Sequence, residues 1–179
     1  MALRGCSGVP RRAVATDVTT IVVDKVMGYM AADRMVTTND GEVAIACDTK
    51  IEEVEIGGDL YLVGMAGMEG PAEHFLEWFR DGDWDDPPSP WESLEEDCAF
   101  TIVVLGPEGI QVADKFMRLT PIHHRWYAIG TGGPYAWAIL EAGCGIDKAM
   151  STAIRMDPSS GFGYQVRYRE HPEQNRDVG

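Results

Sequence analysis

The sequence is short of basic residues. Lysine and arginine number 15 against 29 aspartates and glutamates, which gives the 179-residue chain a formal net charge of −14. Nucleic acids and anionic membrane surfaces bind basic proteins through their phosphate groups, so both repel a chain this acidic. The charge balance therefore argues against polyanion binding and predicts no nucleic-acid partner.

Long apolar segments are also missing. No apolar run approaches the ~20 residues that a membrane-spanning helix needs. The first 17 residues carry Arg4, Arg11 and Arg12 but lack the continuous apolar stretch of a secretory signal peptide. We expect a soluble, cytoplasmic protein with no membrane partner.

Cysteine is sparse and widely spaced. None of Cys6, Cys47, Cys98 and Cys144 forms a CxxC pair, so the spacing is not that of a zinc site or a redox dithiol. We interpret the four as small buried thiols in a reducing compartment. The adjacent His123 and His124 would point to opposite faces of a strand, and no ligand set surrounds them, so we predict no metal and no cofactor.

The length and composition of the chain fit one domain, because 179 residues with 45% hydrophobic content can bury one sizeable core. Residues 1–18 show no periodicity and are interpreted as a leader or propeptide. Alternatively, Val18 marks a wrongly assigned start, since valine codons can serve as initiators. The domain then spans 19–169, and the polar tail 170–179 is expected to be frayed.

Alternation and β-branched residues predict strands in many short segments. These are Thr19–Val23, Val26–Ala32, Val43–Ala46, Lys50–Ile56, Leu60–Ala66, Phe100–Leu105, Ile110–Asp114, Trp126–Ile129 and Phe162–Arg169. Helical periodicity appears over Pro71–Arg80, Pro134–Ala142 and Asp147–Met156. This order predicts an α+β fold, a four-layer αββα sandwich of two antiparallel sheets, rather than a parallel doubly wound sheet.

Thr19, at the start of the first predicted strand, is a candidate nucleophile. A threonine hydroxyl needs a base, and the α-amino group of the same residue has an ordinary pKa of about 7.7–8.0, close to working pH. This chemistry requires that the leader be absent or removed. A nearby lysine would keep the amine basic and a carboxylate would hold that lysine, which makes Lys50 and Asp33 candidates. Gly67, at the end of a strand, would let a substrate approach backbone N–H donors.

Several segments in this order resemble the proteasome β-subunit and bacterial HslV-type threonine peptidase family, from Thr19 to about Tyr168. They are TTIV (19–22), AAD (31–33), TKIEEV (49–54), GMAG (64–67), AIGTGGPYA (128–136) and DPSSG (157–161). The resemblance is most specific at AIGTGGPYA, where Thr131 stands in place of the family's serine. Two departures are a first hairpin about two residues shorter than usual and Val18 where a glycine commonly precedes the threonine.

The resemblance implies the N-terminal nucleophile hydrolase fold and a threonine-type endopeptidase. It assigns seven residues to the catalytic site, with Asp157 and the nearby serine in supporting positions: Thr19, Asp33, Lys50, Gly67, Thr131, Asp157 and Ser160. Thr38 and Met65 are assigned to substrate binding. Met65 favours apolar or uncharged residues before the cleaved bond, although the overall negative field would also attract basic ones.

The family encloses its sites in stacked rings, so the resemblance also implies a homo-oligomeric ring and an ATP-dependent unfoldase that delivers unfolded protein or peptide substrates. Large aromatics on predicted helices, Trp78, Tyr135 and Trp137, are expected in part at subunit contacts. Two alternatives stay open: an N-terminal-nucleophile amidase that acts on a small amide, and a catalytically silent shell or scaffold subunit that keeps its leader.

Each motif also has an ordinary structural interpretation. Thr19 could be simple strand composition, and Asp33 with Lys50 could be a surface ion pair. Gly130–Gly133 could be a turn before a helix, since no Lys-Ser/Thr follows it as in a phosphate-binding loop. Asp157 could be the residue that ends a helix before Pro158.

Overall fold

The computed structural model describes residues 19–37, 44–47, 49–67, 69–82, 84, 100–113 and 116–179. The predicted leader, residues 1–18, and the candidate Thr38 lie outside the described residues, as does most of the acidic segment 81–93.

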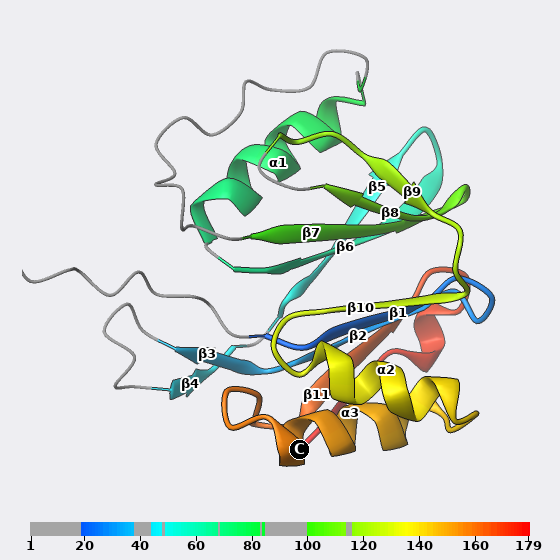
Figure 1. Cartoon of the computed structure of the whole chain (residues 1–179). Coiled ribbons are helices and arrows are strands. Elements are labelled where there is room, and N and C mark those ends of the chain that lie inside the picture. Colours follow the sequence, from blue (N-terminus) through cyan, green and yellow to red (C-terminus); the bar gives the residue numbers. More distant parts are fainter. Residues whose placement is uncertain are drawn as a thin grey trace, which may run out of the picture.

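One antiparallel sheet contains the start of the described chain. Its strand order is β10-β1-β2-β11-β12, and its strands are β1 (Ile21–Asp24), β2 (Tyr29–Asp33), β10 (Trp126–Ile129), β11 (Tyr164–Tyr168) and β12 (Arg176–Val178). Two helices, α2 (Gly133–Glu141) and α3 (Ile146–Met156), cover its outer face (Figure 1).

A second antiparallel sheet lies against the inner face of the first. Its strands follow chain order, as β5 (Ile51–Ile56), β6 (Asp59–Ala66), β7 (Thr101–Gly106), β8 (Gly109–Ala113) and β9 (Thr120–Ile122). Helix α1 (Glu69–Asp81) covers the outer face of this sheet (Figure 1). A short hairpin of β3 (Met35–Thr37) and β4 (Ala44–Ala46) extends from the end of β2, and a 3-10 turn, η1 (Pro172–Gln174), precedes β12.

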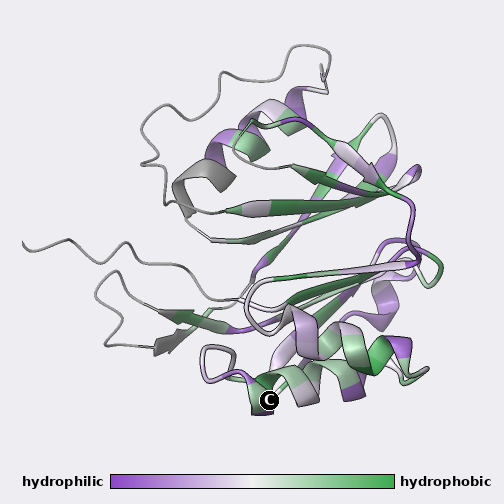
Figure 2. Ribbon diagram, viewed as in Figure 1, coloured by the Kyte–Doolittle hydropathy of each residue, from purple (hydrophilic) through white to green (hydrophobic). Residues whose placement is uncertain are grey.

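The layers arise because the central strands are apolar on both faces. On β1, Ile21 and Val23 belong to the core between the sheets, whereas Val22 belongs to the core under α2 and α3. A third core lies between the second sheet and α1, centred on Phe75 and Phe79. Figure 2 shows the strands in the middle of both sheets as mostly hydrophobic, with hydrophilic residues more frequent in the turns. The predicted α+β sandwich of two antiparallel sheets covered by helices is confirmed.

The first hairpin turns later than predicted. The segment from Val26 was predicted as strand, yet β2 begins only at Tyr29 and residues 25–28 form a turn. The cause is the Asp24 side chain, whose Oδ1 accepts hydrogen bonds from the N–H groups of Val26 at 2.9 Å and Met27 at 3.1 Å. These bonds fold the backbone into an Asx-type turn and leave two apolar side chains exposed.

The tail beyond residue 170 is ordered, which corrects the expectation of fraying. Strand β12 pairs with β11, with Val166 opposite Arg176 and Tyr164 opposite Val178. The Arg176 guanidinium also donates a 2.8 Å hydrogen bond to Asp147 on α3. Pairing with an edge strand satisfies the backbone of a polar segment without an apolar face, so hydropathy alone does not reveal this strand.

Two of the cysteines depart from the interpretation as buried thiols. Cys144 is exposed after α2, and Cys47 is partly exposed after β4. Of the aromatics predicted at subunit contacts, Trp78 packs against Phe75 with ring centroids 5.4 Å apart, whereas Tyr135 is 41% exposed. No helix in the described part of the chain is both long and apolar enough to cross a membrane.

Candidate active site

The segment Thr19–Thr20 lies beside Asp33 because β1 and β2 are antiparallel neighbours. Ile21 pairs with Ala32, so the residues just before β1 lie beside the end of β2. The Asp33 N–H donates to the Thr20 carbonyl at 3.0 Å, and the Thr20 N–H donates to Asp33 Oδ1 at 2.8 Å. Thr19 is almost fully buried at this junction, with 4% of its surface exposed.

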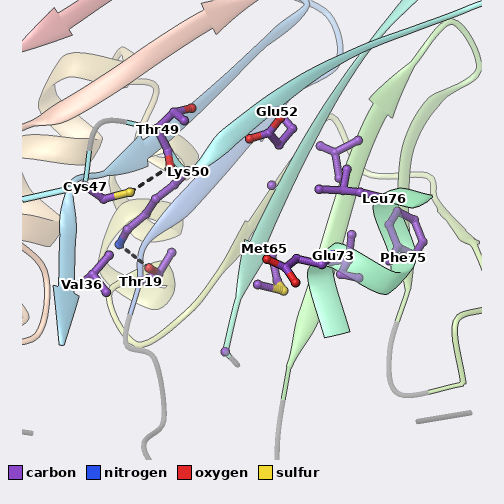
Figure 3. Close-up of a pocket in the computed structure, with 14 residues that line it drawn as sticks. Thr19, Val36, Cys47, Thr49, Lys50, Glu52, Met65, Glu73, Phe75 and Leu76 are labelled. Carbon is purple, nitrogen blue, oxygen red and sulfur yellow. Dashed lines mark hydrogen bonds between the residues drawn. The ribbon is translucent and has the colours of Figure 1, made fainter. Parts of the chain in front are cut away.

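Lys50 reaches this junction from the other sheet. It directly precedes β5, and its Nζ donates a hydrogen bond to Thr19 Oγ1 (Figure 3). The same Nζ donates a second hydrogen bond to the Met35 carbonyl. The same Nζ lies 3.2 Å from Asp33 Oδ1. The lysine side chain is only 8% exposed, so one buried cation joins the threonine hydroxyl to the carboxylate.

The Asp33 carboxylate is fully buried and has several hydrogen-bond donors. Besides Lys50 and the Thr20 N–H, it accepts the N–H of Met35 at 3.1 Å and of Gly161 at 3.2 Å. Burial raises the pKa of Asp33, while the Lys50 charge and the three backbone donors act in the opposite direction. These partners fix the carboxylate beside Lys50, so the pair is not the exposed surface pair of the ordinary interpretation.

Thr131, Asp157 and Ser160 form a second hydrogen-bonded cluster. Asp157 follows α3, and its Oδ2 accepts the Thr131 hydroxyl at 2.6 Å and the Ser160 hydroxyl at 2.8 Å. Since the Ser160 proton goes to Asp157, the Thr20 hydroxyl donates to Ser160 Oγ, 2.7 Å away. The cluster therefore reaches the start of β1 through Thr20, a residue to which the sequence analysis gave no role of its own.

Glycines let the turn before α2 approach this backbone closely. Gly130 has φ +83°, and a Cβ built there would lie 1.4 Å from the Thr19 carbonyl oxygen. A Cβ on Gly132 would lie 1.9 Å from Thr20 Oγ1. The segment is thus a turn before a helix, as the ordinary interpretation holds, but one that packs directly on the candidate nucleophile segment.

A pocket of about 350 Å³ opens beside Thr19 and Lys50. Met65 on β6 and Gly67, which follows this strand, both line it. Cys47, Glu52 and Glu73 line it as well (Figure 3). The volume lies in the range of small-molecule and side-chain sites, roughly 300–1,000 Å³. These three residues carry no signal in the sequence, because single polar residues on a strand or helix resemble ordinary surface residues.

Within the part of the chain that the structure describes, no three or more histidine, cysteine, aspartate or glutamate side chains are grouped so that they could hold a metal ion. His124 instead stacks near Trp137, with ring centroids 5.0 Å apart, and its Nε2 lies 3.5 Å from Glu141.

Comparison with solved structures finds the same architecture in proteins of low sequence identity. Eukaryotic HslV from Trypanosoma brucei superposes with a TM-score of 0.62 at 22% identity, covering 83% of this chain and 97% of that one. Anbu (ancestral beta-subunit) from Yersinia bercovieri gives 0.64 at 13% identity, covering 89% and 86%. Thiobacillus denitrificans BPH gives 0.57 at 19% identity, covering 85% and 98%.

The chain has the sandwich fold of the N-terminal nucleophile hydrolases. No protein-family model and no curated protein matches the chain by sequence. At these identities the similarity establishes the fold alone.

Proposed function

We propose that this chain is a threonine-type endopeptidase with Thr19 as its nucleophile. The observation that carries the proposal is the contact of Lys50 Nζ with both Thr19 Oγ1 and Asp33 in a buried junction beside a pocket. A threonine that only forms part of a strand does not require a buried ammonium group at its hydroxyl, whereas a nucleophilic threonine does need a group that activates it. The resemblance to the proteasome and HslV-type family agrees with this assignment.

In the proposed reaction, Thr19 Oγ1 attacks a peptide carbonyl carbon and its proton passes to the α-amino group of the same residue. The Lys50 ammonium disfavours protonation of that amine beforehand and stabilises negative charge on Oγ1 during attack. The Gly67 N–H donates to the tetrahedral oxyanion. The C–N bond then breaks, the leaving amine takes the proton, and water hydrolyses the Thr19 ester.

Asp33 holds Lys50 in place, and Thr131, Asp157 and Ser160 act as positioning residues. Their hydrogen bonds end on Thr20, so they fix the backbone next to the nucleophile rather than contact Oγ1 themselves. Met65 and Thr38 would contact the substrate. The chain uses no cofactor in this scheme.

The state of the N-terminus tests the proposal most directly. The Thr19 nitrogen forms the peptide bond to Val18, so it becomes a free amine when residues 1–18 are removed, or when translation starts at position 18 and the initiator residue is trimmed. We expect intact mass spectrometry of the active protein to show a chain that starts at Thr19 and cleaves fluorogenic peptides. A leader retained through Val18, with no hydrolysis, would support the silent scaffold subunit. A chain that starts at Thr19 and hydrolyses small amides but no peptides would support the amidase.

We also propose that the chain assembles into closed homo-oligomeric rings of six or more subunits that enclose the sites. A free monomer would leave the Thr19 pocket open to any extended polypeptide. Several large apolar side chains are also exposed, among them Val26 at 67% and Met156 at 52%. Light scattering at micromolar concentration is expected to give a mass of at least six chains. A monomer with full peptidase activity would rule out the chamber but not the threonine chemistry.

The remaining assignments stay predictions. A separate ATP-dependent unfoldase would deliver unfolded protein to the chamber, and the complex would work in the cytoplasm. The net charge of −14 continues to argue against a nucleic-acid partner.

A further inference from the structure

The pocket beside Thr19 has a wall that is partly apolar and partly acidic. Val63 and Met65 on β6, with Leu76 on α1, supply apolar surface. Glu52 on β5 and Glu73 on α1 add two carboxylates to the lining of the same pocket (Figure 3). The Lys50 ammonium also lines this pocket, but it is already bound to Asp33 and Thr19 Oγ1.

The two carboxylates differ in how far they are neutralised. Glu52 Oε2 lies 3.6 Å from Arg80 Nη2, with the two side chains 44% and 51% exposed, so a cation already offsets part of its charge. Glu73 is exposed, and within the part of the chain that the structure describes no ion pair to it is found. Glu73 therefore contributes the larger share of the negative charge that a substrate would meet.

We propose that Glu73, assisted by Glu52, makes this pocket select peptides with lysine or arginine immediately before the cleaved bond. This inference rests on the proposed function of Thr19. The aliphatic stem of a long basic side chain would lie along Val63, Met65 and Leu76, and its cationic head would meet the carboxylates. An acidic side chain would be repelled in the same place. Met65 alone favours an apolar residue before the cleaved bond, and the net charge favours a basic one. With the two carboxylates in the pocket, we expect the basic residue to be preferred.

The net charge alone does not account for such a preference, because it acts on the whole surface. Glu77 provides a matched control, since it lies on the same helix, is exposed and does not line the pocket. Glu77→Gln removes the same charge as Glu73→Gln from a neighbouring position. A local effect changes specificity only in the Glu73 variant.

The experiment uses fluorogenic peptides that differ only before the cleaved bond, with arginine, lysine, norleucine or glutamate. In the parent chain, kcat/KM is expected to be highest for the basic residues and lowest for glutamate. Glu73→Gln should lower the ratio of arginine to norleucine by roughly fivefold, the size of one partly exposed ion pair. Glu77→Gln should leave the ratio unchanged, and Glu73→Lys should make the glutamate peptide the better substrate. Equal ratios in the Glu73→Gln and Glu77→Gln variants would overturn the proposal.

A binding measurement separates this inference from the proposed function. Fluorescence anisotropy of labelled, non-cleaved arginine and norleucine peptides on the Thr19→Ala chain reports selection without hydrolysis. The Thr19→Ala chain should bind the arginine peptide more tightly than the norleucine peptide, and this difference should disappear in the double variant that also carries Glu73→Gln. Such a result would support the charge selection even if the parent cleaved nothing. Thr19-dependent cleavage with equal binding of both peptides would overturn the charge selection and leave the proposed function intact.

Discussion

Replacing Thr19 with alanine is expected to abolish peptide hydrolysis while the protein still folds. The substitution removes Oγ1, the only atom that forms the proposed covalent bond, so kcat should fall by roughly 10⁴-fold or more. Folding should persist because the surrounding junction is held by other contacts, chiefly those of Asp33 with the Thr20, Met35 and Gly161 N–H groups. Steady-state kinetics on fluorogenic peptides and a thermal melt check the two halves of this expectation.

The neighbouring threonine supplies the matched control. Thr20 is fully buried and its Oγ1 is hydrogen-bonded to Ser160. Thr19 Oγ1, in contrast, is hydrogen-bonded to Lys50, and Thr19 borders the pocket. Thr20→Ala should therefore reduce the rate, through a loosened backbone, without abolishing it. Thr19→Ser keeps a hydroxyl in the same place and should retain some activity. Cleavage by the Thr19→Ala chain at the parental rate would show that another residue is the nucleophile.

The architecture was predictable because the strands are short, β-branched and apolar on both faces. Alternation places β5, β6, β7 and β8 within a residue or two of their observed bounds. The predicted bounds are wrong at the first turn, where hydrogen bonds to the Asp24 side chain fold the backbone. Strand β12 was not predicted, because it forms by pairing with β11 and not through a hydropathy pattern. Both effects depend on hydrogen bonds that composition and periodicity do not contain.

The site was predictable only in part. The motif order selected Thr19, Asp33 and Lys50 as candidates, and in the structure Lys50 contacts both Thr19 and Asp33 although it comes from the other sheet. Periodicity could not have placed Lys50 against Thr19, because the contact depends on how the sheets stack. Thr20 and Glu73 were missed for a related reason. The roles we propose for this second threonine and this helical glutamate depend on neighbours that are distant in sequence, Ser160 for Thr20 and the Thr19 pocket for Glu73.

Replacing Lys50 with methionine is expected to affect both catalysis and stability. Loss of the ammonium leaves the α-amine without the cation that keeps it unprotonated and Oγ1 without its donor, so kcat should fall by about 10²- to 10⁴-fold. The buried Asp33 would also lose its counter-charge, which should lower the free energy of unfolding by about 3 kcal/mol at neutral pH. Lys148→Met, on the exposed surface of α3, serves as the control and should change neither quantity.

The stability loss should depend on pH in a way that identifies Asp33 as its source. Burial already raises the pKa of Asp33, and removal of Lys50 takes away the largest opposing influence, so the pKa rises further. A carboxyl whose folded-state pKa exceeds its unfolded value destabilises the fold above that pKa, and the penalty disappears as the pH falls through it. The difference in unfolding free energy between Lys50→Met and the parent should therefore shrink as the pH is lowered. Lys50→Arg, which keeps the charge, should retain most of the stability. A difference that is constant with pH would mean that Lys50 stabilises the fold by packing and that Asp33 is not its electrostatic partner.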